Sequence, residues 1–135
     1  MNSITSKKGI VSTTNYHATN AALTVLKNSG NAIDAAIAAS SVLSVTSQHQ
    51  CGLGGDLFAM VYKDGKVFAL NSSGFSGSKL QEYSKGLSKK KIKTFKDPRL
   101  ITIPGAVDGW LELHKKFGSK KVSEVFKVAI ELAND

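Results

Sequence analysis

Histidines and the single cysteine are the first side chains to consider for chemistry, because both residue types bind metals. His49 and Cys51 lie close together, but no second pair follows at the spacing of a zinc site. His17 and His114 fall on predicted helices with no carboxylate or cysteine paired one turn away. We interpret these histidines as polar or capping side chains and predict no metal site.

Hydroxyl and thiol nucleophiles are also present, but none has an evident activating group. A threonine nucleophile is best activated by its own free α-amine, which an internal Thr14 lacks, and the same applies to Thr13. Cys51 would need a base that the sequence does not locate. We therefore expect Thr13 and Thr14 to be strand residues and Cys51 to be a small residue in a turn.

A glycine-rich segment, Gly52-Leu53-Gly54-Gly55, could suggest a phosphate-binding loop. It is not the dinucleotide fingerprint, because the third glycine of that pattern would fall at Leu57. It also precedes a predicted strand, whereas the fingerprint follows a strand and opens a helix. We predict a tight turn beneath a neighbouring element rather than a nucleotide site.

Two helices are predicted in the first third of the chain, after a short β-favouring run over Gly9–Thr14. Gly30 is expected to end the first helix, because glycine tolerates the left-handed conformation found at many helix ends. Asn31 can cap a second helix over Ala32–Val45, which is apolar on nearly every side and should be buried. The first helix has apolar residues three and four apart: Ala18, Ala21, Ala22, Val25 and Leu26.

A β-hairpin should follow these helices. Leu57–Tyr62 is a continuous apolar run and predicts a buried strand, Asp64-Gly65 is a hairpin turn signal, and Val67–Leu70 forms the returning strand. Residues 72–96 should be mostly loop, with one short helix near Leu80–Tyr83.

Two further helices are predicted near the end of the printed sequence. The apolar side of the third helix would carry Val107, Trp110, Leu111 and Phe117, and Gly118 would end it. The fourth helix would present an apolar stripe of Val122, Val125, Phe126, Ala129 and Ala133. The order of elements predicts an α+β fold, and a hairpin that is marginal alone suggests an incomplete domain.

Composition restricts the remaining function classes. The 135 residues include 41% hydrophobic and 21% charged residues, which indicates a globular protein. The longest apolar stretch, Ala35–Val45, is too short to span a membrane. The net charge of +8 includes six lysines in Lys85–Lys96, where Phe95 is the only aromatic residue. Sites for single strands interleave aromatic residues with basic ones, and sites that read a duplex groove usually show a recognisable helical module. Neither is visible, so we interpret the stretch as a solvated face and expect no nucleic-acid partner. No apolar run follows the first lysines, which predicts a cytoplasmic protein.

Several motifs, taken in order, carry a family resemblance. Gly30–Ala38 reads GNAIDAAIA, Gly52–Phe58 reads GLGGDLF, and Ile103–Trp110 reads IPGAVDGW. With Phe117-Gly118 and Ala129–Ala133, these segments resemble the N-terminal part of the γ-glutamyltransferase (glutathione hydrolase) family over essentially the whole chain.

The resemblance implies a fold and a reaction. Family members are N-terminal-nucleophile hydrolases with a four-layer αββα sandwich, made as a proenzyme that cleaves itself into a large and a small subunit. The new N-terminal threonine of the small subunit is the nucleophile, and its α-amine is the base. Residues 1–135 are then one partial domain at the start of the large subunit, with no catalytic residue of their own. The implied partners are the rest of the proenzyme and a small amide substrate, with no cofactor.

One departure from the family bears on the substrate. Family transferases carry an arginine just after the second hairpin strand, and it holds the α-carboxylate of the substrate. This sequence has Ser73 at that position, followed by Gly74. Serine cannot make the bidentate carboxylate contact of arginine, and this version resembles the transferase-like branch that includes cephalosporin acylases.

Two other function classes remain open on the sequence. The first is an inactive, truncated chain that only packs against a partner. The second is a basic module that binds a polyanion through the lysine-rich stretch. The predicted function is nevertheless an acyl-transferring amide hydrolase of the N-terminal-nucleophile type, represented by a fragment that is inactive alone.

Overall fold

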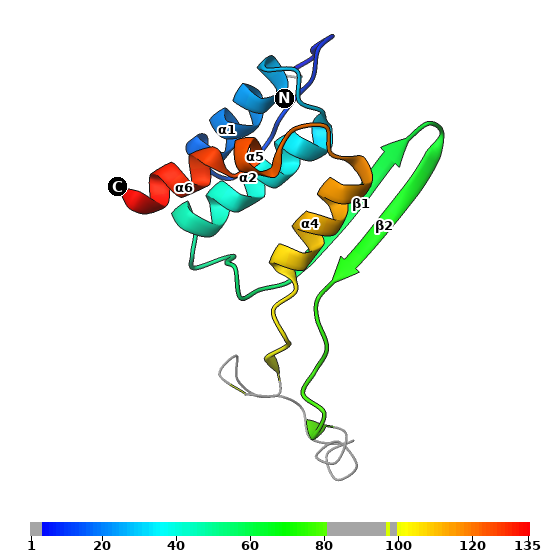
Figure 1. The fold of residues 1–135 in the computed structure, drawn as a ribbon, viewed down its shortest axis with the longest axis vertical. Helices are drawn as coiled ribbons and strands as arrows, with labels where there is room; N and C mark the ends of the chain where they lie inside the picture. The colour runs from blue at the N-terminus through cyan, green and yellow to red at the C-terminus, as the bar shows by residue number, and fades with distance from the viewer. Residues whose placement is uncertain (1–3, 81–96, 98–99) are drawn as a thin grey trace. The chain divides into compact units, whose positions relative to one another are not determined.

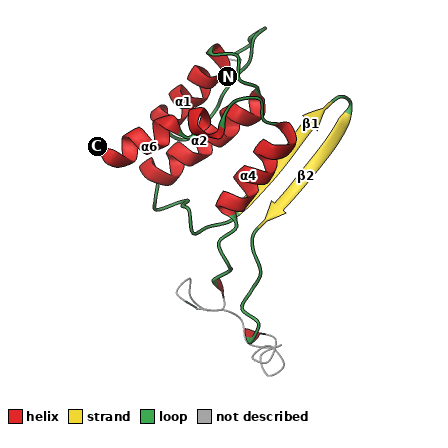
Figure 2. Cartoon of the chain, viewed as in Figure 1, coloured by secondary structure: helices red, strands yellow, loops and turns green. Residues whose placement is uncertain are grey.

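The computed structural model describes residues 4–80, 97 and 100–135. Its contacts divide the chain into two compact units, one of Met1–Gly52 with Trp110–Asp135 and one of Leu53–Gly109. The predicted helix near Leu80–Tyr83 and the basic stretch Lys85–Lys96 lie outside the described residues, apart from Leu80. Figure 1 shows the course of the chain, and Figure 2 shows a mixed α/β structure. No helix among the described residues is both long and apolar enough to cross a membrane.

The first helix, α1, spans Tyr16–Lys27, and Asn15 caps its start by accepting a hydrogen bond from the His17 N–H. The apolar stripe predicted from the sequence is confirmed, since Ala18, Ala21 and Ala22 are buried.

The end of α1 corrects the expectation for Gly30. The left-handed residue is Ser29, with φ 62°, and the Gly30 N–H donates to the Val25 carbonyl at 2.9 Å. A Cβ on Gly30 would approach the Val25 carbonyl oxygen to 2.9 Å, so glycine is needed here for close packing.

The second helix, α2, spans Ala32–Thr46 and is largely buried, as expected. Asn31 caps it by accepting hydrogen bonds from the Ile33 and Asp34 N–H groups. The burial is not uniform, because Ala36 is exposed while Ile37 and Ala38 are each 1% exposed. The buried residues of α2 are Asp34, Ala35, Ile37, Ala38, Ala39, Ser41 and Val42.

The core of this unit lies between α1, α2 and the helices at the end of the chain. α1 and α6 (Lys127–Asn134) both pack against α2. Trp110 is 3% exposed; its indole N–H donates to the Ser40 hydroxyl at 3.1 Å, and its ring lies 5.7 Å from that of Phe126. The central cluster is made of small apolar side chains: Ala18, Ala21, Ala22, Ala35, Ala39, Val42 and Ala129.

The single fourth helix predicted from the sequence is two short helices, α5 (Val122–Val125) and α6. Phe126 separates them, because its ψ of −5° departs from regular α-helical geometry. The Phe126 N–H still donates to the Val122 carbonyl. Val125 and Ala129 are buried as expected, but Val122 and Ala133 are exposed.

The third predicted helix is α4 (Ala106–Phe117), and its buried face differs from the expected one. Ala106 and Trp110 are buried, whereas Val107 and Leu111 are 41% and 43% exposed. The stripe of apolar side chains in the sequence predicted the helix correctly. It did not predict which of these side chains are buried among the described residues.

The predicted hairpin is formed by β1 (Leu57–Lys63) and β2 (Lys66–Ser72), paired from Lys63↔Lys66 to Leu57↔Ser72. Asp64 and Gly65 make the turn with φ of 51° and 75°, the left-handed values that this turn type requires.

The expectation of a buried β1 strand is wrong for this chain. Val61 is 9% exposed, but Phe58, Met60 and Tyr62 on the other face are 67%, 81% and 75% exposed. The sheet has only two strands among the described residues, and the exposure of these three side chains shows that no described segment covers this face.

The β-favouring run Gly9–Thr14 forms no strand either, because no described segment pairs with it. Thr13 instead bonds locally, with its hydroxyl 2.7 Å from the Asn15 carbonyl and 2.6 Å from the Thr19 hydroxyl. High β-propensity does not make a strand without a partner for the backbone N–H and C=O groups.

Candidate functional site

Ser73, the position singled out from the sequence, lies directly after β2. It is partly buried, and its N–H donates to the Asn71 side-chain oxygen at 3.1 Å. Gly74 follows with φ 69°, and a Cβ there would collide with the Ile103 carbonyl oxygen. The chain therefore turns sharply after Ser73 and passes close against the segment that leads into α4.

The start of α4 is fixed to the end of β2 by a second close approach. The Ser72 hydroxyl donates to the Gly105 carbonyl at 2.7 Å, and a Cβ on Gly105 would collide with the Ser72 carbonyl. A Cβ on Gly109 would also lie 2.6 Å from the Leu57 side chain. Glycines at 105 and 109 thus let the Pro104–Gly109 segment lie directly on the ends of both hairpin strands.

The glycine-rich turn before β1 completes this junction. The Gly55 carbonyl accepts hydrogen bonds of 3.0 Å from both the Gly105 and Ala106 N–H groups. The Asp56 carboxylate accepts one of 2.9 Å from the Thr102 hydroxyl. By contrast, a Cβ on Gly52 or Gly54 would meet nothing within 4 Å, so no neighbouring element of the described chain requires glycine at those two positions.

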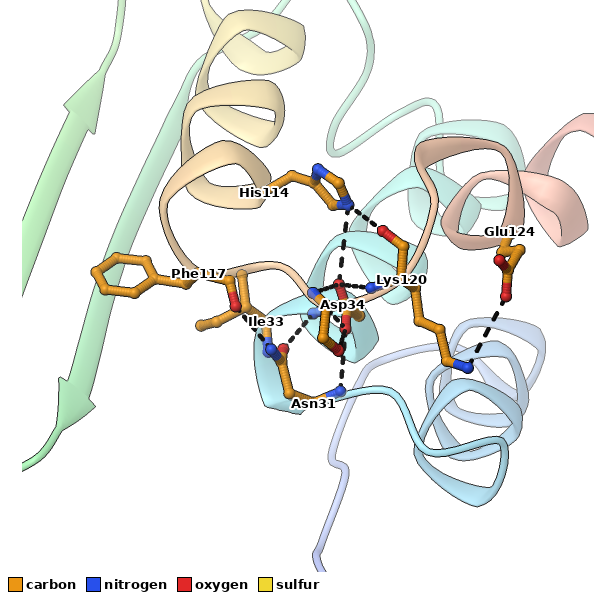
Figure 3. Close-up of polar contacts among 8 residues, drawn as sticks. Asn31, Ile33, Asp34, His114, Phe117, Lys120 and Glu124 are labelled. Carbon is orange, nitrogen blue, oxygen red and sulfur yellow. Dashed lines mark hydrogen bonds and ion pairs between the residues drawn. The ribbon is translucent and has the colours of Figure 1, made fainter.

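A second polar cluster lies in the other unit, at the start of α2 (Figure 3). The side-chain amide of Asn31 donates to the Phe117 carbonyl at 2.6 Å, while its oxygen caps the helix. The Asp34 carboxylate in turn accepts a hydrogen bond of 3.0 Å from the Asn31 N–H. These residues join the first turn of α2 to the end of α4.

Asp34 is the centre of this cluster and is 0% exposed. Its carboxylate accepts hydrogen bonds from the Ser119 hydroxyl at 2.6 Å and from the Ser119 and Lys120 N–H groups. Burial acts to raise the pKa of Asp34, but the hydrogen bonds from Ser119, Asn31 and Lys120 outweigh it and hold that pKa below its ordinary value of 3.8.

His114 also lies in this cluster. Its Nε2 is 2.7 Å from the Lys120 carbonyl oxygen and 4.0 Å from Asp34 Oδ1. Because a carbonyl oxygen only accepts, this hydrogen bond requires a proton on Nε2. A Cβ on Gly118 would lie 2.6 Å from the His114 ring, so glycine there leaves space for the imidazole. Together these contacts fix the turn between α4 and α5, which is a structural role.

The other residues considered for chemistry are not brought together. His49 and Cys51 are exposed, and the Cys51 thiol lies 3.7 Å from the Ser47 carbonyl. His17 lies at the start of α1 beside Tyr16. No group of three or more His, Cys, Asp or Glu side chains in the described part of the chain could hold a metal ion.

Comparisons with known proteins identify the family of this chain. The sequence matches the family described as gamma-glutamyltranspeptidase over residues 18–135. The chain belongs to the γ-glutamyltranspeptidase family.

Two solved structures and one curated sequence illustrate the relationship. The glutathione hydrolase-like YwrD proenzyme of Bacillus subtilis (strain 168) is 34% identical over 98% of this chain. The cephalosporin acylase of Bacillus halodurans is 36% identical over 87% of this chain, with a TM-score of 0.75. The Helicobacter pylori γ-glutamyltranspeptidase is 27% identical over 98% of this chain, with a TM-score of 0.77.

The match covers only part of each relative. The chain spans 26% of the YwrD proenzyme, 22% of the Bacillus halodurans acylase chain and 39% of the Helicobacter pylori chain. The family resemblance seen in the motifs is confirmed over residues 18–135, and each of these three relatives contains much more polypeptide than this chain.

Sequence reasoning missed two features of this family member. Ser119, which donates to Asp34, carries no motif signal of its own, and its role depends on a contact between positions 85 apart. Asp56 was treated as part of a glycine-rich turn. Its hydrogen bond from Thr102 was missed because the two residues are 46 positions apart and neither carries a local signal for the contact.

Proposed function

We propose that residues 1–135 form the N-terminal part of the large subunit of an N-terminal-nucleophile amide hydrolase or acyltransferase. The observation that carries this proposal is the family match over residues 18–135 by a chain that spans about a quarter of a proenzyme relative. Its partner is the remainder of the same proenzyme, which supplies the small subunit and the nucleophilic threonine.

The reaction that we propose is acyl transfer from an amide. The threonine hydroxyl of the small subunit attacks the amide carbonyl, and the α-amine of the same residue takes the hydroxyl proton. Backbone N–H groups stabilise the tetrahedral oxyanion, which collapses as the protonated amine leaves. Water or an acceptor amine then attacks the resulting ester and restores the threonine. None of these groups belongs to residues 1–135, so this chain alone is expected to be inactive.

The contribution that we assign to this chain is to the acyl-binding side of the site, through Ser73. A serine lacks the charge and the forked geometry with which arginine binds a carboxylate. We infer that the enzyme acts on γ-glutamyl amides and also on related acyl amides that lack an α-carboxylate. The similarity to both a glutathione hydrolase-like proenzyme and a cephalosporin acylase supports this range.

The fold that we propose for the intact protein is the four-layer αββα sandwich, of which residues 1–135 are a single partial domain. In support, one face of the hairpin is apolar and exposed, formed by Phe58, Met60, Tyr62 and Val67. A two-stranded hairpin is marginal in water without further strands. The remaining polypeptide would supply those strands and cover this face.

The proposed function is tested by comparing residues 1–135 with the intact, processed protein on a chromogenic γ-glutamyl anilide. The intact protein should release the aniline with turnover in the usual enzyme range, about 1–1,000 per second, and residues 1–135 should release none. Activity in residues 1–135 alone would contradict the assignment of the nucleophile to another segment. An intact protein that neither processes itself nor turns over any acyl anilide would instead favour an inactive packing partner.

A further inference from the structure

Asp56 and Ser73 occupy matching positions at the open end of the hairpin. The last pair of the ladder is Leu57↔Ser72, so Asp56 and Ser73 are the next positions of the same antiparallel register. Here the ladder ends at Leu57↔Ser72, and Gly105 packs against both Gly55 and Ser72.

The same short segment, Thr102-Ile103, contacts both sides of this open end. On one side, the Thr102 hydroxyl donates to Asp56 Oδ1 at 2.9 Å. On the other, Thr102 pairs with Ser76, and the Ile103 N–H donates to the Phe75 carbonyl at 2.9 Å. The carboxylate of Asp56 is therefore held near the segment that follows Ser73 and is exposed to solvent.

The electrostatic consequence depends on the residue at position 73. An arginine there would place a positive charge close to Asp56 and offset its negative charge. Serine brings no charge, so the Asp56 carboxylate is not offset from that position. At physiological ionic strength, partly exposed charges interact appreciably when they lie within about 8 Å of each other, which is the Debye length.

We propose that Asp56 is a specificity-determining residue that disfavours acyl groups carrying a carboxylate and favours neutral or amine-bearing acyl groups. This inference rests on the proposed function, because it takes the region around Ser73 to be the acyl-binding side of the site. It goes further by giving that site a sign of charge and naming the residue that supplies it.

The test compares kcat/KM of the intact, processed enzyme for three 4-nitroanilides: glutaryl, butyryl and 4-aminobutyryl. Asp56→Asn removes the charge but keeps an oxygen that can accept from Thr102. It should raise the glutaryl-to-butyryl ratio about three- to tenfold and lower the aminobutyryl-to-butyryl ratio similarly, as expected for one partly screened charge. Both changes should shrink at high salt.

Two matched variants separate charge from structure. Thr102→Val removes the hydrogen bond to Asp56 without changing any charge, and Asp64→Asn removes one negative charge at the far turn of the hairpin. Both should leave the two substrate ratios within about twofold of wild type, because the charge near the site is retained.

The results distinguish a failure of the inference on Asp56 from a failure of the proposed function. Unchanged ratios in Asp56→Asn, or equal changes in Asp56→Asn and Thr102→Val, would overturn this inference and leave the proposed function standing. An enzyme that turns over none of the three anilides and no γ-glutamyl anilide would overturn the proposed function and this inference with it.

Discussion

The Ser119 hydroxyl donates a hydrogen bond of 2.6 Å to the Asp34 carboxylate, across 85 positions of the sequence. Asp34 lies in the first turn of α2 (Figure 3). Ser119 lies between the end of α4 at Phe117 and the start of α5 at Val122. The contact therefore gives the GNAID motif a physical role. The Asp34 side chain takes part in the cap at the start of α2 and also accepts the hydrogen bond from Ser119. It thereby fixes the turn after which the last helices pack onto the core.

Replacing Asp34 with alanine should destabilise this unit strongly. The substitution leaves the Ser119 hydroxyl and the N–H groups of Asn31, Ser119 and Lys120 without their acceptor in a buried site. We expect a loss of about 2–4 kcal/mol in the free energy of unfolding, measured by urea denaturation. Glu124→Ala is the control, because Glu124 is exposed and forms a surface ion pair of 3.9 Å with the Lys120 ammonium. It should cost less than about 1 kcal/mol.

The contribution of Asp34 should also depend on pH in a defined direction. Its pKa in the folded protein lies below the ordinary value of 3.8, so the unfolded chain binds more protons between the two values. Stability from this group is then fully present above about pH 5 and is lost as the pH falls through the ordinary pKa and then the folded-state pKa. The stability advantage of wild type over Asp34→Asn should be constant from pH 7 to about 5 and shrink below that. An advantage that persists undiminished at pH 2 would contradict the assignment.

The two faces of α2 should respond differently to the same enlargement. Ala38 is 1% exposed, whereas Ala36 is exposed, although the sequence suggested burial all round. Ala38→Phe should cost about 1–3 kcal/mol of unfolding free energy by overpacking, and Ala36→Phe should change it by less than about 0.5 kcal/mol in residues 1–135. Thermal or urea unfolding of both variants measures the difference. Equal destabilisation would mean that both faces of α2 are covered.

Features that depend on local sequence were predictable. The spacing of small apolar residues predicted α1 and the buried α2, and Asp64-Gly65 predicted the hairpin turn. These signals act within a few residues, through helix periodicity and the left-handed backbone of the turn. The capping role of Asn31 was predictable for the same reason.

Features that depend on a distant partner were not predictable. Gly9–Thr14 has β-favouring residues but no described strand to pair with, and Phe58, Met60 and Tyr62 remain exposed although β1 has the continuous apolar sequence of a strand buried on both faces. In both cases the sequence specifies contacts that the described residues do not supply. The Asp34–Ser119 contact was missed because nothing local to Ser119 indicates it.

The last prediction concerns Ser73, which the sequence placed at the position of a carboxylate-binding arginine. The structure puts Ser73 directly after β2, in a sharp turn before Gly74, so a longer side chain at 73 would start from a well-defined backbone. A charge-assisted hydrogen bond contributes about 1.5–3 kcal/mol, or roughly 10- to 150-fold in binding. In the intact, processed enzyme, wild type should therefore discriminate weakly between a γ-glutamyl anilide and an acyl anilide without the α-carboxylate. Ser73→Arg should raise the preference for the γ-glutamyl substrate by at least about tenfold, measured as a ratio of kcat/KM values.

Ser73→Gln is the matched control for this prediction, because it lengthens the side chain without adding a positive charge. It should leave the substrate ratio within about threefold of wild type, since a neutral amide gains much less from a carboxylate than a guanidinium does. A preference of about a thousandfold exceeds what a single charge-assisted hydrogen bond can contribute. If wild type already shows such a preference for the γ-glutamyl substrate, another residue holds the α-carboxylate. The role assigned to Ser73 would then be wrong.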